Sequence, residues 1–245
     1  ARAVSDAARA GFGLVNLDLI YGIPEQSLRD WQQSLNETLM LEPGHLSLYA
    51  LGLEAGTPLR EWVARGEVSA PDDDLAAEQY ELASDVLAAA GYRQYEISNW
   101  ALPGQECRHN LQYWRNQDWL GLGPGAHGHV AGVRTRTCLS PQRYIEAFSE
   151  EREARRFPLT PATDECLHLG RKDEIIETLI MGLRLTEEGV GRAEFSRRFG
   201  EDVMDIFGEE FQAHESRGLL EINADRVRLR PAGRLLSNQV FRDLV

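Results

Sequence analysis

Chemically versatile side chains are concentrated between Cys107 and Gly128, in the stretch CRHNLQYWRNQDWLGLGPGAHG. The stretch combines a thiol, an imidazole, a guanidinium and an amide with a tyrosine and a tryptophan, and it ends in closely spaced glycines. Metal-competent side chains beside aromatic rings and a bent backbone are typical of a binding site more than of a hydrophobic core. We therefore treat this stretch as the first candidate for a site.

His109 is the leading candidate within the stretch, because histidine is the commonest side-chain ligand of metals. Asn110 could hold one ring nitrogen, and Arg108 could pair with a carboxylate of a ligand. Tyr113 and Trp114 would supply a flat apolar wall. A flat, carboxylate-bearing metal complex such as haem would use every one of these features, whereas a structural histidine would need none of them.

Three neighbouring residues compete with His109 as ligands. Cys107 is a soft donor two residues away, and His127 and His129 flank Gly128, so that in a strand both would lie on one face. The cysteines of the chain, at positions 107, 138 and 166, are too widely spaced for a cysteine-rich metal motif. A metal or cluster held by several thiolates is therefore not expected on this chain.

The glycines at positions 121, 123, 125 and 128 invite a dinucleotide-binding interpretation. That motif requires a preceding strand and a helix that opens at the third glycine. Here the glycines lead into HVAGVRTRT, which resembles a strand. We therefore interpret them as positions of close backbone packing or of close approach to a ligand.

Asp18 stands out because it lies inside the otherwise apolar segment VNLDLIYG. A buried carboxylate costs several kcal/mol unless it is paired or hydrogen-bonded, so we expect it to have a partner or a function. The structural alternative is a hydrogen bond to a neighbouring loop. The functional interpretation places it at the mouth of a parallel barrel, and Glu96, Ser98 and Asn99 end a later strand in an equivalent place.

Apolar periodicity and turn residues predict alternating helices and strands before Gly128. We expect helices over residues 1–10, 27–41 and 74–90, and strands over residues 15–22, 45–53 and 92–98. Such an alternation is typical of an α/β fold with a buried parallel sheet.

Beyond Gly128 the pattern becomes mainly helical. We expect a strand or hairpin over residues 130–138, helices over 141–150, 163–185, 192–199 and 203–217, and then a hairpin and a helix from Pro231. The order of the last elements is winged-helix-like. Two prolines and a helix cap in FPLTPATDE predict a boundary near Leu159, which gives domains over residues 1–158 and 159–245.

The charge balance argues against nucleic acid as a partner. The chain has 26 basic and 39 acidic residues and a net charge of −13, which disfavours phosphate-rich ligands. From Arg184 to the C-terminus it carries 10 arginines and 12 acidic residues, whereas a DNA-binding winged helix should show a basic stripe. We therefore expect the C-terminal region to be a packing or protein-contact module.

Composition also predicts the compartment. No apolar run approaches the roughly 20 residues needed to cross a bilayer, and the chain does not open on a signal peptide. Three scattered cysteines fit a reducing cytoplasm. A cytoplasmic protein is therefore expected, and peripheral contact with a membrane surface stays open. The first ten residues read as the second half of an amphipathic helix, which suggests a missing N-terminal segment.

Together these segments resemble the oxygen-independent coproporphyrinogen oxidase-like branch of the radical S-adenosylmethionine (SAM) superfamily, in particular the HemW-like haem chaperones. The matching stretches cover essentially the whole chain: NLDLIYGIP, HLSLYAL, YEISNWALPGQECRHNLQYW, DWLGLGPGAHG and VRLRPAGRLLSNQVF. The resemblance implies the last part of a partial (β/α)6 barrel and the whole helical C-terminal domain. The family's CxxxCxxC loop, which holds a [4Fe-4S] cluster, and its glycine-rich SAM segment have no counterpart here.

The resemblance also implies roles for particular residues. Asp18 and the strand segment Leu48, Tyr49, Ala50 and Leu51 would belong to the wall that faces SAM. His109, in the HNxxYW motif that runs through Asn110 to Tyr113 and Trp114, would bind haem and is the candidate iron ligand.

Two functions follow from the resemblance. The first is a chaperone that binds haem and transfers it to haem-requiring proteins. The second is an enzyme of porphyrin biosynthesis, a SAM-dependent radical coproporphyrinogen III oxidase. The HNxxYW motif favours the first, because the oxidases of the family lack it.

Overall fold

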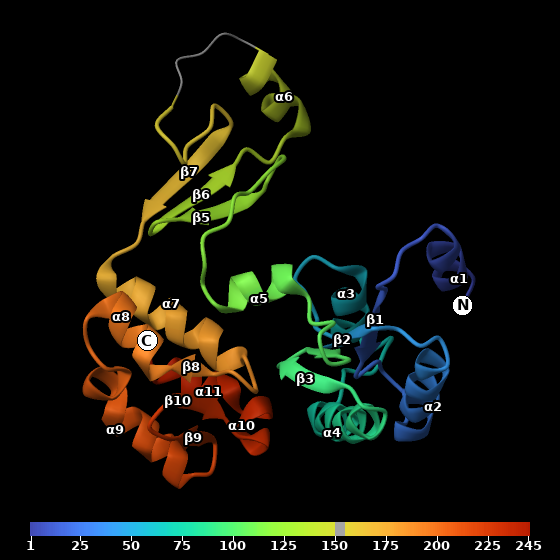
Figure 1. Ribbon diagram of the computed structural model, residues 1–245. Coiled ribbons are helices and arrows are strands. Elements are labelled where there is room, and N and C mark those ends of the chain that lie inside the picture. The colour runs from blue at the N-terminus through green and yellow to red at the C-terminus, as the bar shows by residue number, and fades with distance from the viewer. Residues whose placement is uncertain (150–154) are drawn as a thin grey trace. The chain divides into compact units, whose positions relative to one another are not determined.

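The computed structural model describes residues 1–149 and 155–245, and the chain divides into two compact units, residues 1–107 and 108–245 (Figure 1). We call them unit 1 and unit 2. This division differs from the predicted domains 1–158 and 159–245, because strand pairing continues across the predicted boundary.

Unit 1 is built on a four-stranded sheet with the order β1-β2-β4-β3. Its strands are β1 (Asn16–Tyr21), β2 (His45–Ala50), β3 (Arg93–Glu96) and β4 (Asn99–Ala101). β1 and β2 are parallel, as predicted, whereas β4 runs antiparallel to both of its neighbours. The strand predicted over residues 92–98 is present as β3 but ends at Glu96, because the chain turns back there into β4 and forms a hairpin. Among the described residues the strands form no closed barrel.

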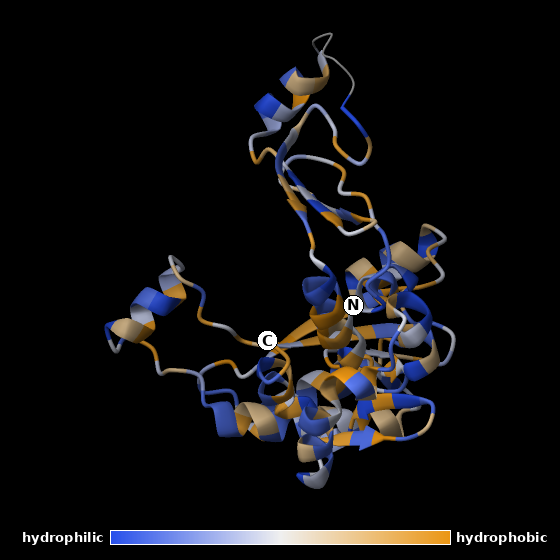
Figure 2. Ribbon diagram, turned by 90° about the vertical axis from the view of Figure 1, so that its left-hand side faces the viewer, coloured by the Kyte–Doolittle hydropathy of each residue, from blue (hydrophilic) through white to orange (hydrophobic). Residues whose placement is uncertain are grey.

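The helices of unit 1 are α1 (Arg2–Arg9), α2 (Leu28–Leu39), α3 (Pro58–Ala64) and α4 (Asp73–Ala89). α2 begins where predicted, because Ser27 and Asp30 form a reciprocal capping box with the first free N–H groups. α2 and α4 bury Trp31, Leu35 and Leu87 against Leu46 and Leu48 of the sheet. Hydrophobic residues, drawn orange in Figure 2, run along the strands, and the helices mix orange and blue residues.

The first part of unit 2 contains a second sheet with the order β5-β6-β7. Its elements are α5 (Arg108–Trp114), β5 (His127–Val130), β6 (Val133–Thr137), α6 (Pro141–Ser149) and β7 (Thr163–His168). The helix predicted over residues 163–185 begins only at Arg171, because residues 163–168 pair with β6 as a strand. β7 therefore joins residues on both sides of the predicted boundary into one sheet.

The rest of unit 2 is mainly helical, in the predicted winged-helix-like order. Its elements are α7 (Arg171–Arg184), β8 (Val190–Gly191), α8 (Arg192–Phe199), α9 (Val203–Ser216), β9 (Leu220–Ile222), β10 (Arg226–Leu229), α10 (Pro231–Leu235) and α11 (Ser237–Arg242). Leu179, Leu183, Phe211 and Leu220 are fully buried here and form the core of this part. No helix within the described ranges is long and apolar enough to cross a membrane.

Candidate functional site

One face of the unit 1 sheet carries a hydrogen-bonded group of polar side chains. Asn16 of β1 donates through Nδ2 to Asp18 Oδ1 over 2.7 Å and to Ser47 Oγ over 3.1 Å. Asn16 Oδ1 lies 2.7 Å from Nδ1 of His45, whose Nε2 lies 2.8 Å from the hydroxyl of Tyr95. Burial lowers the pKa of His45, while the charge of Asp18 opposes that shift. The imidazole is therefore held as a neutral hydrogen-bonding group beside the Asp18 carboxylate.

The polar group extends across the whole sheet. Asp18 pairs in register with Ser47, Ser47 with Asn99, and Asn99 with Glu96, so the four side chains form a row from β1 to β3. Glu96 is fully buried and accepts a hydrogen bond from Asn99. This row includes the strand-end residues Glu96 and Asn99, which the sequence singled out together with Asp18.

Asp18 itself is exposed, not buried as expected. β1 lies at one edge of the sheet, and within the described residues no helix covers the face on which Asn16, Asp18 and Ile20 alternate. Its carboxylate is solvated and bound by Asn16, so it bears no large desolvation cost. The row is therefore exposed only at its Asp18 end, where a charged or polar ligand can reach it, while Ser47, Asn99 and Glu96 are buried.

Of the four residues assigned to the SAM-facing wall, Leu48, Tyr49 and Ala50 end β2 and Leu51 follows it, and they do not share one face. Tyr49 is exposed and follows His45 and Ser47 on the polar face, as the two-residue period requires. Leu48 is buried in the hydrophobic core beneath the helices. Ala50 is exposed at the end of the strand, and the half-buried Leu51 donates its N–H to Tyr21. Tyr49 is thus the member of this group that shares the polar face with Asp18, in register with Ile20.

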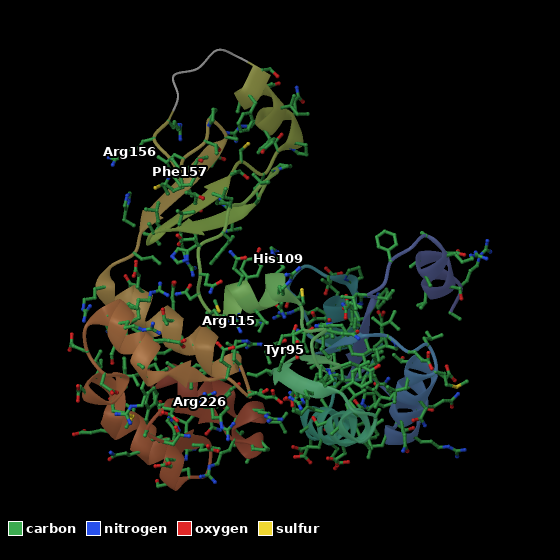
Figure 3. The ribbon with its side chains drawn as sticks, viewed as in Figure 1. Tyr95, His109, Arg115, Arg156, Phe157 and Arg226 are labelled. Atoms are coloured by element: carbon green, nitrogen blue, oxygen red, sulfur yellow. The ribbon has the colours of Figure 1, made fainter. Side chains whose placement is uncertain are left out.

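The second candidate site lies on α5 in unit 2. His109 is exposed on this helix (Figure 3). Its ring meets that of Tyr113, one turn later, edge to face with a centroid distance of 4.8 Å. Tyr113 meets Trp119 at 4.9 Å, and Trp119 meets His129 at 5.0 Å. Four rings therefore connect the exposed His109 to the buried His129.

Tyr113 and Trp114 do not form one wall, contrary to the prediction. Successive residues of a helix point about 100° apart, so the two rings enter different surroundings. The Arg184 guanidinium lies over the Trp114 ring, 4.5 Å from its centroid. Tyr113 belongs to the ring series of His109, and Trp114 belongs to the packing of α5 against α7.

The remaining residues of the HNxxYW region keep the surface polar. Arg108 is exposed, and within the described ranges its guanidinium has no ion-pair partner. Asn110 is half-buried, and Cys107 is a free, exposed thiol at the end of unit 1. His109 therefore combines an accessible imidazole with a free cationic neighbour, which are the two groups a carboxylate-bearing metal complex needs.

His129 differs from His127, although both lie on β5. His127 is exposed, whereas His129 is 1% exposed, and in the described part of the chain neither of its ring nitrogens has a hydrogen-bond partner. Burial lowers the pKa of His129, and Arg134 and Arg198 act in the same direction while Asp118 opposes them. The ring is held neutral at the inner end of the series.

The glycine run serves backbone packing. A Cβ on Gly121 would collide with the carbonyl oxygen of His127, and one on Gly128 would lie 2.9 Å from Thr135 Oγ1 and 3.1 Å from Gly121 N. These glycines allow the segment that carries Trp119 to cross β5 closely. This supports the packing interpretation over a nucleotide-binding loop.

A pocket of about 440 Å³ lies beside Trp114 in unit 2. Its walls come from α5, α7 and α8 and include Arg115, Phe195 and Arg198. Arg115 donates to both carboxylate oxygens of Glu188, from Nε to Oε1 over 3.0 Å and from Nη2 to Oε2 over 2.7 Å. The pocket has the size of a small-ligand site. Nowhere in residues 1–149 and 155–245 do three metal-binding side chains converge.

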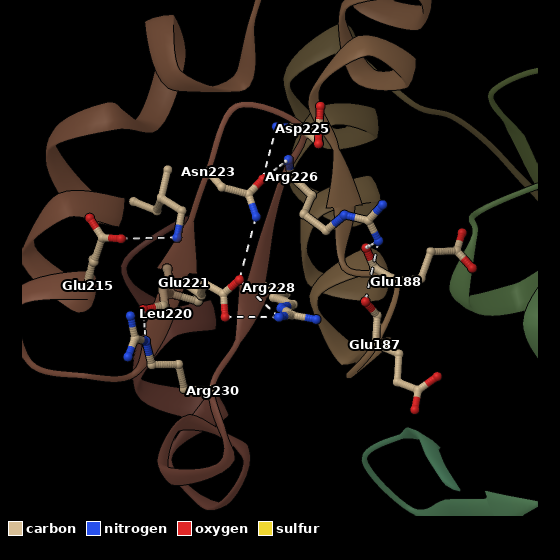
Figure 4. Close-up of polar contacts among 11 residues, drawn as sticks. Glu187, Glu188, Glu215, Leu220, Glu221, Asn223, Asp225, Arg226, Arg228 and Arg230 are labelled. Carbon is tan, nitrogen blue, oxygen red and sulfur yellow. Dashed lines mark hydrogen bonds and ion pairs between the residues drawn. The ribbon is translucent and has the colours of Figure 1, made fainter.

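The hairpin of the winged-helix-like region has little free positive charge (Figure 4). Arg228 donates to both oxygens of Glu221, Arg226 to the carbonyl of Glu188, and Arg230 to the carbonyl of Leu220. Guanidinium groups with such internal partners are poorly placed to contact phosphates. The arrangement supports a packing role for this hairpin.

Comparison with known proteins indicates the class of protein that this chain resembles. Residues 169–236 match the family of HemN C-terminal domains. The structure covers 57% of the coproporphyrinogen III oxidase HemN from Escherichia coli, a radical SAM enzyme, with a TM-score of 0.73 over 99% of this chain and 18% identity. This likeness shows the radical SAM α/β fold of HemN.

Sequence comparison then narrows the class. The chain is 38% identical over its full length to the heme chaperone HemW of Mycobacterium tuberculosis strain H37Rv, of which it covers 58%. Identity to HemW of Bacillus subtilis is 34%, over 96% of this chain and 60% of that protein. Identity to the mouse mitochondrial radical S-adenosyl methionine domain-containing protein 1 is 38%, over 89% of this chain and 50% of that protein.

The chain is therefore similar to the HemW-like heme chaperones along its whole length, and part of its C-terminal region matches the HemN C-terminal domain family, in agreement with the resemblance that the sequence motifs indicated. It spans about 58–60% of the length of the bacterial chaperones named above.

Sequence reasoning missed several members of both sites. Asn16, His45 and Ser47 organise the polar face, and Trp119 links Tyr113 to His129. A signal for the first group was available, since Asn16 and Asp18, like His45 and Ser47, recur with a period of two on neighbouring strands. No comparable signal existed for Trp119, because only the tertiary structure brings its ring to β5.

Proposed function

We propose that the protein binds haem at His109 on α5 and transfers it to haem-requiring proteins. The proposal rests on the exposed imidazole of His109, with the Tyr113 ring packed against it. The Arg108 guanidinium, next to it in sequence, has no ion-pair partner in the described part of the chain. The similarity to HemW chaperones along the whole chain supports the same assignment.

The surroundings of His109 suit haem that is bound reversibly and must be released to another protein. His109 would supply the iron ligand, Arg108 would pair with a propionate, and the edge of the Tyr113 ring would contact the porphyrin. An exposed helix face holds a porphyrin from one side only. The acceptor protein would therefore reach the other side without unfolding of the carrier.

The described residues suit SAM but not the [4Fe-4S] cluster. The open polar face, with Asp18 and Tyr49, offers a carboxylate and a ring that suit a ribose or an adenine, and we assign it to SAM. The cluster does not fit the described residues, where no three metal-binding side chains converge. We therefore assign no chemical step to it here.

A haem titration tests the proposal, with absorbance as the readout. We expect saturable binding that loses one equivalent in His109→Ala and is unchanged in Cys107→Ala, an exposed thiol two residues away. The loaded protein should then pass haem to apomyoglobin. Identical stoichiometry and spectrum in His109→Ala would refute His109 as the ligand.

The second candidate function is oxidative decarboxylation of coproporphyrinogen, which the HemN-like fold and the polar face favour. The test is turnover of coproporphyrinogen by the full-length protein with SAM and a reductant. Robust turnover would displace the chaperone assignment, and haem transfer without turnover would support it.

The proposed partners are haem and haem-accepting proteins, and the proposed compartment is the cytoplasm. The internally paired arginines of the hairpin and the net charge of −13 support a partner other than nucleic acid. Peripheral contact with a membrane stays compatible with this assignment.

A further inference from the structure

A second pocket in unit 2 lies far along the chain from the HNxxYW motif and has the chemistry of a metalloporphyrin site. Its volume is about 430 Å³, within the range of small-molecule sites. It lies between the β5-β6-β7 sheet and the segment 156–159, and its lining is Val130, Ala131, Val133, Arg156, Phe157, Pro158, Leu159, Cys166 and His168.

The sheet supplies the reactive side chains. Cys166 and His168 are two residues apart on β7, so both lie on one face, about 7 Å apart along the strand. His168 pairs in register with Val133, which itself pairs with Val130, and this places two apolar side chains on the same face. The thiol is free, and both reactive residues are exposed.

The opposite face of the sheet carries ion pairs, so the pocket must lie on the other face. Arg134, opposite Leu167, donates to Glu177 of α7 over 2.7 Å. Arg136 forms an ion pair with Glu165 on that same face. Cys166 and His168, which alternate with these residues, therefore belong to the face that leads away from the Glu177 contact.

The segment 156–159 forms the other wall and is tied to the start of β7. Arg155 donates to the carbonyl of Thr163, and Thr160 N–H donates to Thr163 Oγ1 over 2.8 Å. Figure 3 shows Arg156 and Phe157 side by side on this segment. Phe157 is 68% exposed, and the Arg156 guanidinium has no ion-pair partner among the described residues.

We propose that this pocket is a second haem site, with Cys166 or His168 as the iron ligand and Arg156 as the partner of a propionate. The inference rests on the proposed haem-carrier function. A thiolate or an imidazole is what haem iron accepts from proteins. The apolar side chains and Phe157 would contact the ring, and the Arg156 guanidinium, without an ion-pair partner among the described residues, suits a carboxylate. A site open on one side suits transient holding of haem before transfer.

The test is a haem titration of the whole chain in matched variants, followed by absorbance. We expect two equivalents in the wild type, one in His109→Ala, one in the double variant Cys166→Ser with His168→Gln, and none when all three changes are combined. Leu167→Gln, on the same strand but the other face, is the control and should keep both equivalents. Cys107→Ala controls for adventitious binding at an exposed thiol. Circular dichroism of each variant excludes misfolding.

The single variants identify the ligand. If Cys166 binds the iron, Cys166→Ser in the His109→Ala background replaces a thiolate-type spectrum with a nitrogen-type one. If His168 binds it, His168→Gln removes the nitrogen-type spectrum. Iron-free protoporphyrin should still bind when both ligands are replaced, and should bind about tenfold more weakly in Arg156→Gln, as expected for loss of one charge-assisted hydrogen bond.

The outcomes separate this inference from the proposed function. If His109→Ala binds no haem, the second site does not exist and the carrier site at His109 stands. If the Cys166 and His168 double variant loses binding while His109→Ala does not, the second site stands and His109 is not the ligand. Unchanged stoichiometry and spectrum in the double variant would overturn the second site.

Discussion

At the residue scale, His109 and His129 show how surroundings give the same side chain different roles. His109 is exposed and free to take a ligand, whereas His129 is buried with both ring nitrogens unpaired among the described residues. Tyr113 and Trp119 lie between them as a continuous series of edge-to-face rings. This edge-to-face packing holds the Tyr113 ring in place, and His109 packs against that ring.

The buried state of His129 predicts a dependence of stability on pH. Burial and the nearby Arg134 lower its pKa, so the unfolded chain binds the proton more readily than the folded one. Stability is therefore lost as the pH falls below about 6.5, the ordinary pKa of histidine, by at most about 1.4 kcal/mol per pH unit.

Urea unfolding at pH 7.5 and 5.5 checks this expectation. His129→Phe removes the titrating group and keeps a ring against Trp119, so it should lose less stability over this range than the wild type. A residual slope is expected because burial also lowers the pKa of His45. Equal slopes in the variant and the wild type would contradict the prediction.

At the element scale, the periods of strand and helix decide which predicted residues can act together. The two-residue period of β2 puts Tyr49 on the same face as Asp18 and sends Leu48 into the core. The 100° step of α5 separates Tyr113 from Trp114. Adjacent residues of a motif therefore lie in different surroundings. Tyr49 and Tyr113 lie at the candidate sites, whereas Leu48 and Trp114 belong to the packing.

Gln79 of α4 tests how the elements of unit 1 are joined. It is fully buried, accepts from Gly22 N–H over 2.7 Å and donates to the carbonyl of Gln26 over 3.0 Å. These bonds hold the turn after β1 against α4. Gln79→Leu keeps the volume but leaves a donor and an acceptor unpaired, and should cost about 2–4 kcal/mol.

The measurement is the free energy of unfolding in urea, with Gln32→Leu as the matched control. Gln32 is an exposed glutamine of α2, so its replacement should change stability by less than about 0.5 kcal/mol. A cost for Gln79→Leu no larger than that of the control would mean that the two bonds do not stabilise the turn.

At the scale of the whole molecule, the chain contains two compact units that divide at residues 107 and 108. Unit 1 has its own core around Trp31, Leu46 and Trp100. Unit 2 buries Leu179, Leu183 and Phe211 and includes all three strands of the second sheet. The boundary predicted at residues 158 and 159 would instead remove β7 from its partner β6.

This arrangement predicts the behaviour of fragments. Residues 108–245 should fold alone and melt cooperatively, because the fragment keeps its core and its sheet. Residues 159–245 should lose the structure of β7, because its backbone N–H and C=O groups would have no β6 partner, and should be prone to aggregation. Circular dichroism and thermal melts of the two fragments check this. Equal cooperativity in both would show that the shorter fragment is a complete folding unit.

The sequence by itself determined the resemblance to HemW-like proteins, the order of most elements and the regions in which the candidate sites lie. Those features depend on local information, namely residue types, periods of two and 3.6, and caps such as Ser27 and Asp30. HNxxYW and NLDLIYG could be found without any knowledge of distant contacts.

Only the tertiary structure decided features that depend on pairing between distant segments. Residues 163–168 became a strand because β6 offered a partner, and β4 reversed direction to pair with β2 and β3. Asp18 is exposed because no described helix covers its face, and Trp119 reaches His129 because close glycines let two segments cross. Burial and cross-strand pairing are properties of the assembled chain, and local sequence does not encode them alone.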